Sequence, residues 1–380
     1  MNFDWQPRTR LVYGLNSVER VGELARTLGG TKPLLVTDPG IVAAGHAGRV
    51  QRLLGTAVLY DRVRENPTTR DVEACVEFAR SAGVDLIVAI GGGSSLDTAK
   101  GCNFLLTNGG RMQDYWGVGK ATKPMLPLIA IPTTAGTGSE CQSFALIADE
   151  HTHQKMACGD PKASARVAIL DPQLTLTQPR QITACTGIDA VAHAVETAVT
   201  TKRTALSALF SREAFQLTVP NLPLVLDDPQ NLEARAAMQL GAAFAGVAIE
   251  NSMLGATHSA ANPLTAHYGV VHGRAVGLML PAVVRFNAAD PLARSAYVAL
   301  AVQARLADAS DSETKALSAL LDHLERLLDA AAVPRRLSDH GIAAADIPTL
   351  AQEAARQWTA QFNPRPVTAA DFEKIYAEVL

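Results

Sequence analysis

Hydrophobic residues follow two different patterns along the chain, and the pattern changes about halfway. In the first half, short apolar runs rich in β-branched residues alternate with longer amphipathic stretches. The runs are 33–38 (PLLVTD), 56–61 (TAVLYD), 84–90 (VDLIVAI) and 127–134 (PLIAIPTT). Strands that alternate with helical segments predict a parallel sheet covered by helices.

After about residue 175 the strand pattern stops and segments rich in Ala and Leu follow. These segments are 187–200, 204–219, 231–251 and 313–331. Their apolar periodicity predicts helices. We therefore expect an α/β domain over residues 1–175 and an all-α domain over 176–380. They would join near Leu170–Gln181, where Pro172 and Pro179 fall.

Composition narrows the classes of function. A chain of 380 residues exceeds one ordinary core, and two domains imply a cleft between them. A net charge of −3 gives no electrostatic footprint for nucleic acid or an anionic membrane. The five scattered cysteines form no CxxC pair, which argues against a disulfide framework and predicts reduced thiols. Without a signal-like N-terminus or a membrane-length apolar run, we expect a cytoplasmic protein that handles small molecules.

A glycine-rich turn follows the third apolar run. In VDLIVAIGGGSSLDTAKG, a predicted strand leads into Gly91-Gly92-Gly93, Ser94 and a predicted helix. Glycines let the backbone approach an anion, and a helix N-terminus favours phosphate. A turn of this kind also serves as a plain strand–helix connection, so the segment alone leaves both readings open.

Two further loops follow apolar runs. Asp38 ends the run 33–38 and would accept hydrogen bonds from a ribose diol, or it occupies an ordinary turn before Pro39. The loop PTTAGTGSE covers 132–140. Because the carboxyl ends of parallel strands share one edge of a sheet, all three loops would meet where ligands bind.

A possible metal site lies in the second half. In GIDAVAHAVE (187–196), Asp189 and His193 share one helical face at positions i and i+4. Such a pair can also be a simple helix-surface hydrogen bond. With His258 and His272 it forms a carboxylate and three imidazoles, which suits iron(II) or zinc in a catalytic rather than a structural site.

These segments together resemble a known family. GGGSSLDTAK (91–100), PTTAGTGSE, GIDAVAHAVE and the segment from His258 to Gly273 look like the successive motifs of the iron-containing (group III) alcohol dehydrogenases. The order and spacing match from TRLVYG (9–14) to FNPRPVT (362–368). The resemblance implies a Rossmann-like N-terminal dinucleotide-binding domain, an all-α C-terminal domain of dehydroquinate synthase-like architecture, and a metal between them.

The resemblance also implies roles for single residues. Asp189, His193, His258 and His272 fall on the metal ligands of the family. Gly92, Gly93 and Ser94 fall on its diphosphate loop, Asp38 on its ribose-side acid, and Thr133, Thr134 and Thr137 on the nicotinamide-side loop. Asp97, Lys155 and Asn66 fall on further cofactor-side positions.

The chain departs from the family at Asn262. Much of the family has a histidine four residues after the ligand that matches His258, often assigned to proton relay. An amide does not titrate near neutral pH, so Asn262 puts the relay and the substrate class in question. Pro263 predicts that the helix ends or kinks here, which would bring His267 toward the cleft. His267 is then either the relay or a hydrogen-bonded structural residue.

The expected activity is the interconversion of an alcohol with an aldehyde or ketone, with NAD as hydride carrier and Fe2+ as Lewis acid. NADP and Zn2+ are the alternatives, and the carboxylate of Asp38 favours NAD. We expect a homo-oligomer, in the form of a dimer. The rival functions are a lyase resembling dehydroquinate synthase, a reductase of a phosphonate or acidic aldehyde, and a non-catalytic nucleotide sensor.

Overall fold

The computed structural model describes residues 5–152 and 154–380, and within them the chain divides into two compact units. The first unit ends at Gln178 and the second runs from Pro179 to Leu380. This division lies inside the segment where the prolines predict the joint.

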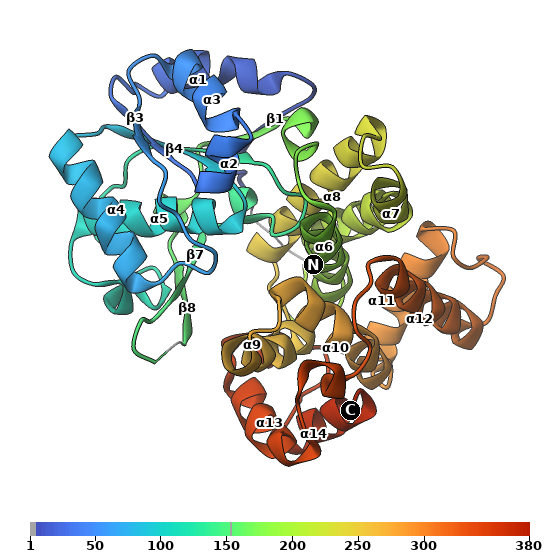
Figure 1. Ribbon diagram of the computed structural model, residues 1–380. Helices are drawn as coiled ribbons and strands as arrows, with labels where there is room; N and C mark the ends of the chain where they lie inside the picture. Colours follow the sequence, from blue (N-terminus) through green and yellow to red (C-terminus); the bar gives the residue numbers. More distant parts are fainter. Residues whose placement is uncertain (1–4, 153) are drawn as a thin grey trace. The chain divides into compact units, whose positions relative to one another are not determined.

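The first unit combines strands and helices (Figure 1). Its strands are β1 (Arg10–Tyr13), β2 (Pro33–Val36), β3 (Val58–Tyr60), β4 (Leu86–Gly91), β5 (Gly117–Val118), β6 (Leu128–Pro132), β7 (Phe144–Ala148), β8 (Lys155–Gly159) and β9 (Val167–Leu170). Its α-helices are α1 (Val21–Thr27), α2 (Pro39–Ala43), α3 (His46–Leu54), α4 (Thr69–Ala82) and α5 (Gly93–Asn108). Six strands form a parallel sheet in the order β1-β9-β6-β4-β2-β3, and a small second sheet has the order β5-β8-β7.

Helices cover both faces of the six-stranded sheet (Figure 1). Leu34 and Ile87 pack on one face, in a core shared with α4 and α5. Leu35 and Val88 pack on the other, in a core shared with α1 and α3. Successive residues of a strand point to opposite faces, so a strand buried on both sides reads as one continuous apolar run. The predicted α/β class is confirmed.

The order of the strands creates a point where the connections diverge. β2 pairs with β3 on one side and with β4 on the other, both in parallel. The chain leaves β2 toward α3 on one face, whereas it leaves β4 into α5 on the opposite face. In open α/β sheets, such a switch point leaves a crevice at the carboxyl ends of the strands, where ligands bind.

The second unit is helical. Its α-helices are α6 (Arg180–Thr197), α7 (Ala205–Asp227), α8 (Leu232–Glu250), α9 (Ala256–Tyr268), α10 (His272–Asn287), α11 (Pro291–Gln303), α12 (Glu313–Ala330), α13 (Ile347–Arg356) and α14 (Ala369–Glu378). Helix α6 is buried along most of its length and packs against α7, α8 and α10.

Helices α7 and α9 continue through internal prolines, although proline disfavours the interior of a helix. Helix α7 contains Pro220 and Pro223 and extends to Asp227, beyond the expected end at 219. Helix α9 contains Pro263 and continues to Tyr268. An internal proline costs roughly 3 kcal/mol, whereas each large apolar side chain that becomes buried contributes about 1.5–3 kcal/mol. The buried face of α7 therefore outweighs its two prolines.

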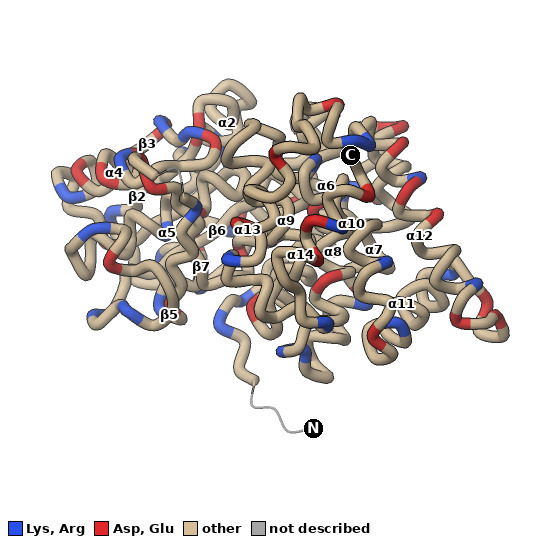
Figure 2. Tube along the Cα trace, turned by 90° about the horizontal axis from the view of Figure 1, so that it is seen from below, with Lys and Arg blue, Asp and Glu red and all other residues tan. Residues whose placement is uncertain are grey.

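Charged residues are interspersed by sign along the chain (Figure 2). This distribution agrees with a net charge of −3. Among residues 5–152 and 154–380, no helix has both the length and the apolar composition needed to span a lipid bilayer.

Candidate active site

Three helices of the second unit bring one carboxylate and three imidazoles together. Asp189 and His193 lie one turn apart on α6, His258 lies in the first turn of α9, and His272 is the first residue of α10. The Oδ1 atom of Asp189 lies 3.3 Å from Nε2 of His258, 3.5 Å from Nε2 of His193 and 3.9 Å from Nε2 of His272. We call these four side chains the Asp189 cluster.

The spacing in the Asp189 cluster suits a divalent cation. Donor atoms about 2.1 Å from a shared cation lie about 3.0–3.4 Å from one another in octahedral or tetrahedral geometry. The ligand atoms of Asp189, His258 and His272 all lie within 4.8 Å of one another, and His193 reaches the same carboxylate oxygen. Imidazole nitrogen and carboxylate oxygen suit iron(II) and zinc alike.

Burial differs across the cluster. The side chains of Asp189 and His258 are each 6% exposed, whereas that of His272 is 26% exposed. Burial opposes the charge on His258, but Glu196 and Asp189 outweigh it and raise the pKa of His258 to about 9. Burial alone would raise the pKa of Asp189, but His193 and the other two imidazoles hold it well below its ordinary value. A cation at this site therefore competes with protons for the same donors.

Gly273 allows helix α10 to pack closely against helix α6. A Cβ atom on Gly273 would lie 2.1 Å from the carbonyl oxygen of Cys185, far inside van der Waals contact. The two helices can therefore approach this closely only with glycine at this position. Since His272 directly precedes Gly273 and Cys185 lies one turn before Asp189, this contact brings His272 toward the cluster.

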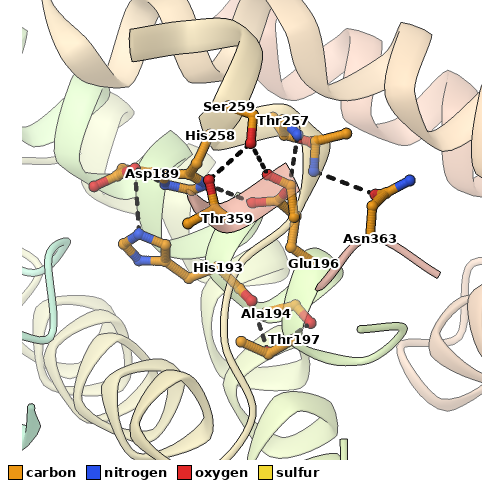
Figure 3. A network of polar contacts seen from close by, with 12 residues as sticks. Asp189, His193, Ala194, Glu196, Thr197, Thr257, His258, Ser259, Thr359 and Asn363 are labelled. Carbon is orange, nitrogen blue, oxygen red and sulfur yellow. Dashed lines mark hydrogen bonds and ion pairs between the residues drawn. The ribbon is translucent and has the colours of Figure 1, made fainter. Parts of the chain in front are cut away.

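Glu196 contacts the cluster from the same face of α6, although sequence reasoning gave it no role. Its Oε2 atom accepts a hydrogen bond from Nδ1 of His258, and its Oε1 atom accepts from the backbone N–H of Thr257 at 2.7 Å (Figure 3). The only trace in the sequence is its spacing, seven residues after Asp189 and three after His193, which keeps all three on one helical face.

Asn262 and His267 have partners on other segments. Asn262 lies one turn after His258 on the same face of α9 and donates to Oε1 of Gln357 at 3.1 Å. His267 pairs with Glu353 on α13 at 2.7 Å, and its side chain is 48% exposed. Nine residues separate His258 from His267, which places them on opposite sides of a helix. Their assignment to catalysis stays a prediction.

In the first unit, the three predicted loops meet at the carboxyl edge of the large sheet. Gly91 at the end of β4 lies opposite Pro132 at the end of β6, and the backbone N–H of Thr133 donates to the Gly91 carbonyl at 3.0 Å. Helix α5 begins at Gly93, and its N-cap residue, Gly92, has no side chain to cap the first N–H groups. An uncapped helix N-terminus at the switch point fits a diphosphate.

The glycine-rich turn and the threonine loop are in close contact. A Cβ atom on Gly93 would lie 2.8 Å from Cγ2 of Thr137, so the loop leaves no room for a larger residue there. Gly92 faces Thr134 in the same way, at 3.3 Å. Ser94 accepts a hydrogen bond from the backbone N–H of Asn66 at 3.2 Å. The structure thus gathers these expected cofactor residues at one edge.

Asp38 has two hydrogen bonds within the protein. Its Oδ1 atom caps α2 by accepting from the backbone N–H of Ile41 at 3.1 Å, and its Oδ2 atom accepts from Ser95 at 3.2 Å. The side chain is therefore a helix cap and lies beside the turn after β4. Its role toward a ribose stays a prediction.

Asp97 is buried and lies near a fully buried lysine, Lys100, that the sequence patterns did not indicate, whereas Lys155 is half-buried. Burial raises the pKa of Asp97, although the charges of Lys100 and Lys155 oppose that effect. Lys100 is fully buried and donates to the carbonyl and hydroxyl oxygens of Ser139 at 2.6 and 2.8 Å. Next to Ser139, burial raises the pKa of Glu140 to about 7. Lys100 therefore ties α5 to the end of the threonine loop.

Comparisons with known proteins agree with this arrangement. A family model described as "Iron-containing alcohol dehydrogenase" matches residues 7–172, and one described as "Fe-containing alcohol dehydrogenase family, C-terminal" matches residues 183–380. The chain is 34% identical to Alcohol dehydrogenase 4 of Schizosaccharomyces pombe, over 97% of this chain and 87% of that protein. It is 33% identical to the NAD-dependent methanol dehydrogenase of Bacillus methanolicus, over 97% of both chains. The crystal structure of a 1,3-propanediol oxidoreductase superposes with a TM-score of 0.96, at 29% identity and full coverage of both chains.

Proposed function

Because the chain belongs to the iron-containing alcohol dehydrogenase family, it is an oxidoreductase of alcohols and aldehydes, and we propose that the Asp189 cluster is its metal site. The observation that carries the proposal is the convergence of three imidazole nitrogens on one carboxylate oxygen, at 3.3 to 3.9 Å. A carboxylate and three imidazoles are a donor set for a catalytic cation rather than a structural one.

When bound, iron(II) supplies Lewis acidity toward the substrate oxygen, and zinc is the alternative cation for the same ligands. The protein holds the ligand atoms of the Asp189 cluster in place and limits the access of water to them. Asp189, His193 and His258 are almost fully buried, whereas His272 is partly exposed. We propose that a small alcohol or aldehyde approaches from the side of His272.

For the cofactor, we propose NAD on the carboxyl edge of the large sheet. The uncapped start of α5, with Gly92, Gly93 and Ser94, would bind the diphosphate. Asp38 would accept from the adenosine ribose and disfavour the additional phosphate of NADP. The remaining proposed cofactor contacts are Thr133, Thr134 and Thr137 beside the nicotinamide, with Asn66, Asp97 and Lys155 at further positions.

The substrate is proposed only as a class, a small alcohol or aldehyde, and a phosphonate or acidic aldehyde remains within that class. Asn262 would orient the substrate oxygen or a water through its amide, since it lies one turn from His258. We also propose that the protein is cytoplasmic, since its five buried cysteines suit a reducing compartment. As the oligomeric state we propose a homodimer. Light scattering after size exclusion tests the dimer.

The experiment that tests the function is a screen of aldehydes with NADH and NADPH after the metal-free protein has been reconstituted with iron or zinc. We expect oxidation of NADH that requires both the metal and the aldehyde. Conversion of substrate without net change in NADH would instead support a lyase. Nucleotide binding without any metal requirement or turnover would support a sensor.

A further inference from the structure

The carboxylate of Glu196 joins helix α6 to the first turn of helix α9. Glu196 is 3% exposed and lies on the face of α6 that carries Asp189 and His193. Its two oxygens reach two successive residues of α9, the backbone N–H of Thr257 and the ring Nδ1 of His258 (Figure 3). One side chain therefore fixes both the start of the helix and the ring of a proposed metal ligand.

The hydrogen bond to Nδ1 determines which nitrogen of His258 faces the cluster. If Nδ1–H donates to Glu196, the lone pair of the neutral ring is on Nε2. Nε2 is the atom that lies 3.3 Å from Oδ1 of Asp189. The ring is thus held in the tautomer and orientation that a metal ligand requires, and a carboxylate partner also raises its basicity.

A second residue, Asn363, also binds the first turn of α9. Oδ1 of Asn363 accepts from the backbone N–H of Ala256 at 3.2 Å (Figure 3). Asn363 is in turn hydrogen bonded to Asn287 on α10. The first two N–H groups of α9 therefore have acceptors from outside the helix. With its backbone anchored in this way, His258 depends on Glu196 for the orientation of its ring.

We propose that Glu196 is a positioning residue that sets how tightly the Asp189 cluster retains its metal, an inference that rests on the metal function proposed above. Both acceptor oxygens are needed. In a glutamine, one carboxylate oxygen is replaced by an NH2 group, which would face the N–H of either Thr257 or His258, donor against donor. Glu196→Gln would therefore keep the size of the side chain and lose one of the two bonds.

The test uses cobalt(II) as a spectroscopic probe in the full-length protein. The visible spectrum of the bound cobalt and the rate at which a chelator removes it are compared between wild type and Glu196→Gln. We expect metal affinity to fall about 10- to 100-fold, as is typical when an outer carboxylate partner of a histidine ligand is lost. A changed cobalt spectrum should accompany the faster loss.

Ser259→Ala is the matched control. Ser259 follows His258 directly and bonds to Thr359 at 2.7 Å in the same buried region, but it is not bonded to the ring of His258. This variant should lose thermal stability in the metal-free form and keep the wild-type cobalt spectrum and rate of metal loss. It separates general damage to the first turn of α9 from a specific effect on the imidazole.

The outcomes are distinguishable. If wild-type protein binds no cobalt, the proposed metal function fails. If wild type binds cobalt, and folded Glu196→Gln loses it at the same rate and has the same spectrum, only the role of Glu196 is overturned. If Glu196→Gln does not fold, Glu196→Asp is measured, because its shorter side chain cannot bridge both donors. Faster metal loss at wild-type stability then supports the proposal, and a wild-type rate and spectrum overturn it.

Discussion

The Nε2 atom of His258 lies 3.3 Å from Oδ1 of Asp189, although 69 positions separate the two residues in the chain. Asp189 also lies within 3.9 Å of the other two imidazoles of the cluster, so its oxygen is at the centre of the donor set. Because Asp189 supplies the only carboxylate of the proposed ligands, its replacement should affect the metal most directly.

Asp189→Ala should abolish metal binding and lower turnover by at least about 100-fold. Loss of a hydrogen-bond partner of a metal ligand costs up to about 100-fold, and loss of the ligand itself should cost at least as much. Nucleotide affinity should stay unchanged because the proposed cofactor residues all belong to the first unit. Metal analysis of the purified protein and titration of NADH fluorescence measure the two properties. His323→Gln, on α12 and bonded to Arg326, is the control. Full metal content in Asp189→Ala would refute the assignment.

Asp38→Asn should improve the use of NADPH relative to NADH by about fivefold, because it removes a negative charge beside the proposed site of the 2′-phosphate. Asparagine also caps helices well, so the start of α2 should be preserved. The ratio of kcat/KM for the two cofactors measures the effect. Asp290→Asn, at the cap of α11, removes the same charge from the second unit and should leave that ratio unchanged. An unaltered ratio in Asp38→Asn would limit Asp38 to its capping role.

Gly273→Ala should destabilise the second unit by about 2 kcal/mol, the typical cost of forcing atoms into a packed contact. The added methyl group would meet the carbonyl of Cys185 and push α10 away from α6, which moves His272 from the cluster. The denaturant concentration at the midpoint of unfolding and the affinity for cobalt should both fall. Gly48→Ala is the control, because its nearest atom lies 3.5 Å away on a flexible arginine, and it should stabilise α3 slightly. Equal stability of the two variants would contradict the close approach of α6 and α10.

Glu140 should make the stability of the protein depend on pH. Burial raises its pKa in the folded protein from 4.5 to about 7, despite the nearby charge of Lys100. Its favourable contribution is complete below pH 4.5, where both states are protonated, and it is lost as pH rises to about 7, a change of about 3 kcal/mol. Urea unfolding at pH 5 and pH 8 should therefore show a smaller decline for Glu140→Gln than for wild type. The exposed Glu77→Gln should behave like wild type, and an identical decline in Glu140→Gln would contradict the raised pKa.

The sequence predicts the elements whose burial leaves a local pattern. β2, β4 and β6 are buried on both faces and appear as continuous apolar runs. β1, β9 and the small sheet of β5, β7 and β8 were not predicted. Each has only two to five residues, and β9 is missed although all four of its residues are buried, because so short an apolar run gives little periodic signal. Pro263 was misleading, because α9 continues through it, and α7 extends past its expected end through two prolines. In both helices tertiary packing outweighs a local preference against helix.

The residues of the candidate site divide in the same way, into those that a sequence pattern marks and those that it does not. Asp189 and His193 were predicted because their spacing is local, and His258 and His272 because their motif is similar to that of a family. Glu196 and Lys100 were missed, because a glutamate or lysine in a helix ordinarily faces solvent. Their burial is a consequence of contacts with Thr257 and Ser139, which are distant in sequence, and no local pattern encodes such contacts.

The route by which the proton leaves the substrate depends on which side chains of α9 face His258. His267 pairs with Glu353 and lies half a turn around α9 from the face of His258, whereas Asn262 lies on that face. His267→Gln should therefore retain metal content, kcat and the pH profile of alcohol oxidation. Asn262→His should instead add an ionisation near the ordinary histidine pKa of about 6.5, because it introduces a titrating group one turn from the metal.

Asn262→Gln is the control, since it keeps an amide on the same face and should add no ionisation. The two variants together distinguish the two possible routes. If His267→Gln lowers kcat and changes the pH profile, His267 is the relay despite its position, through movement of α9 or an intervening water. If His267→Gln behaves as wild type and only Asn262→His changes the profile, the native enzyme lacks a titrating relay on this helix, and the proton leaves by water.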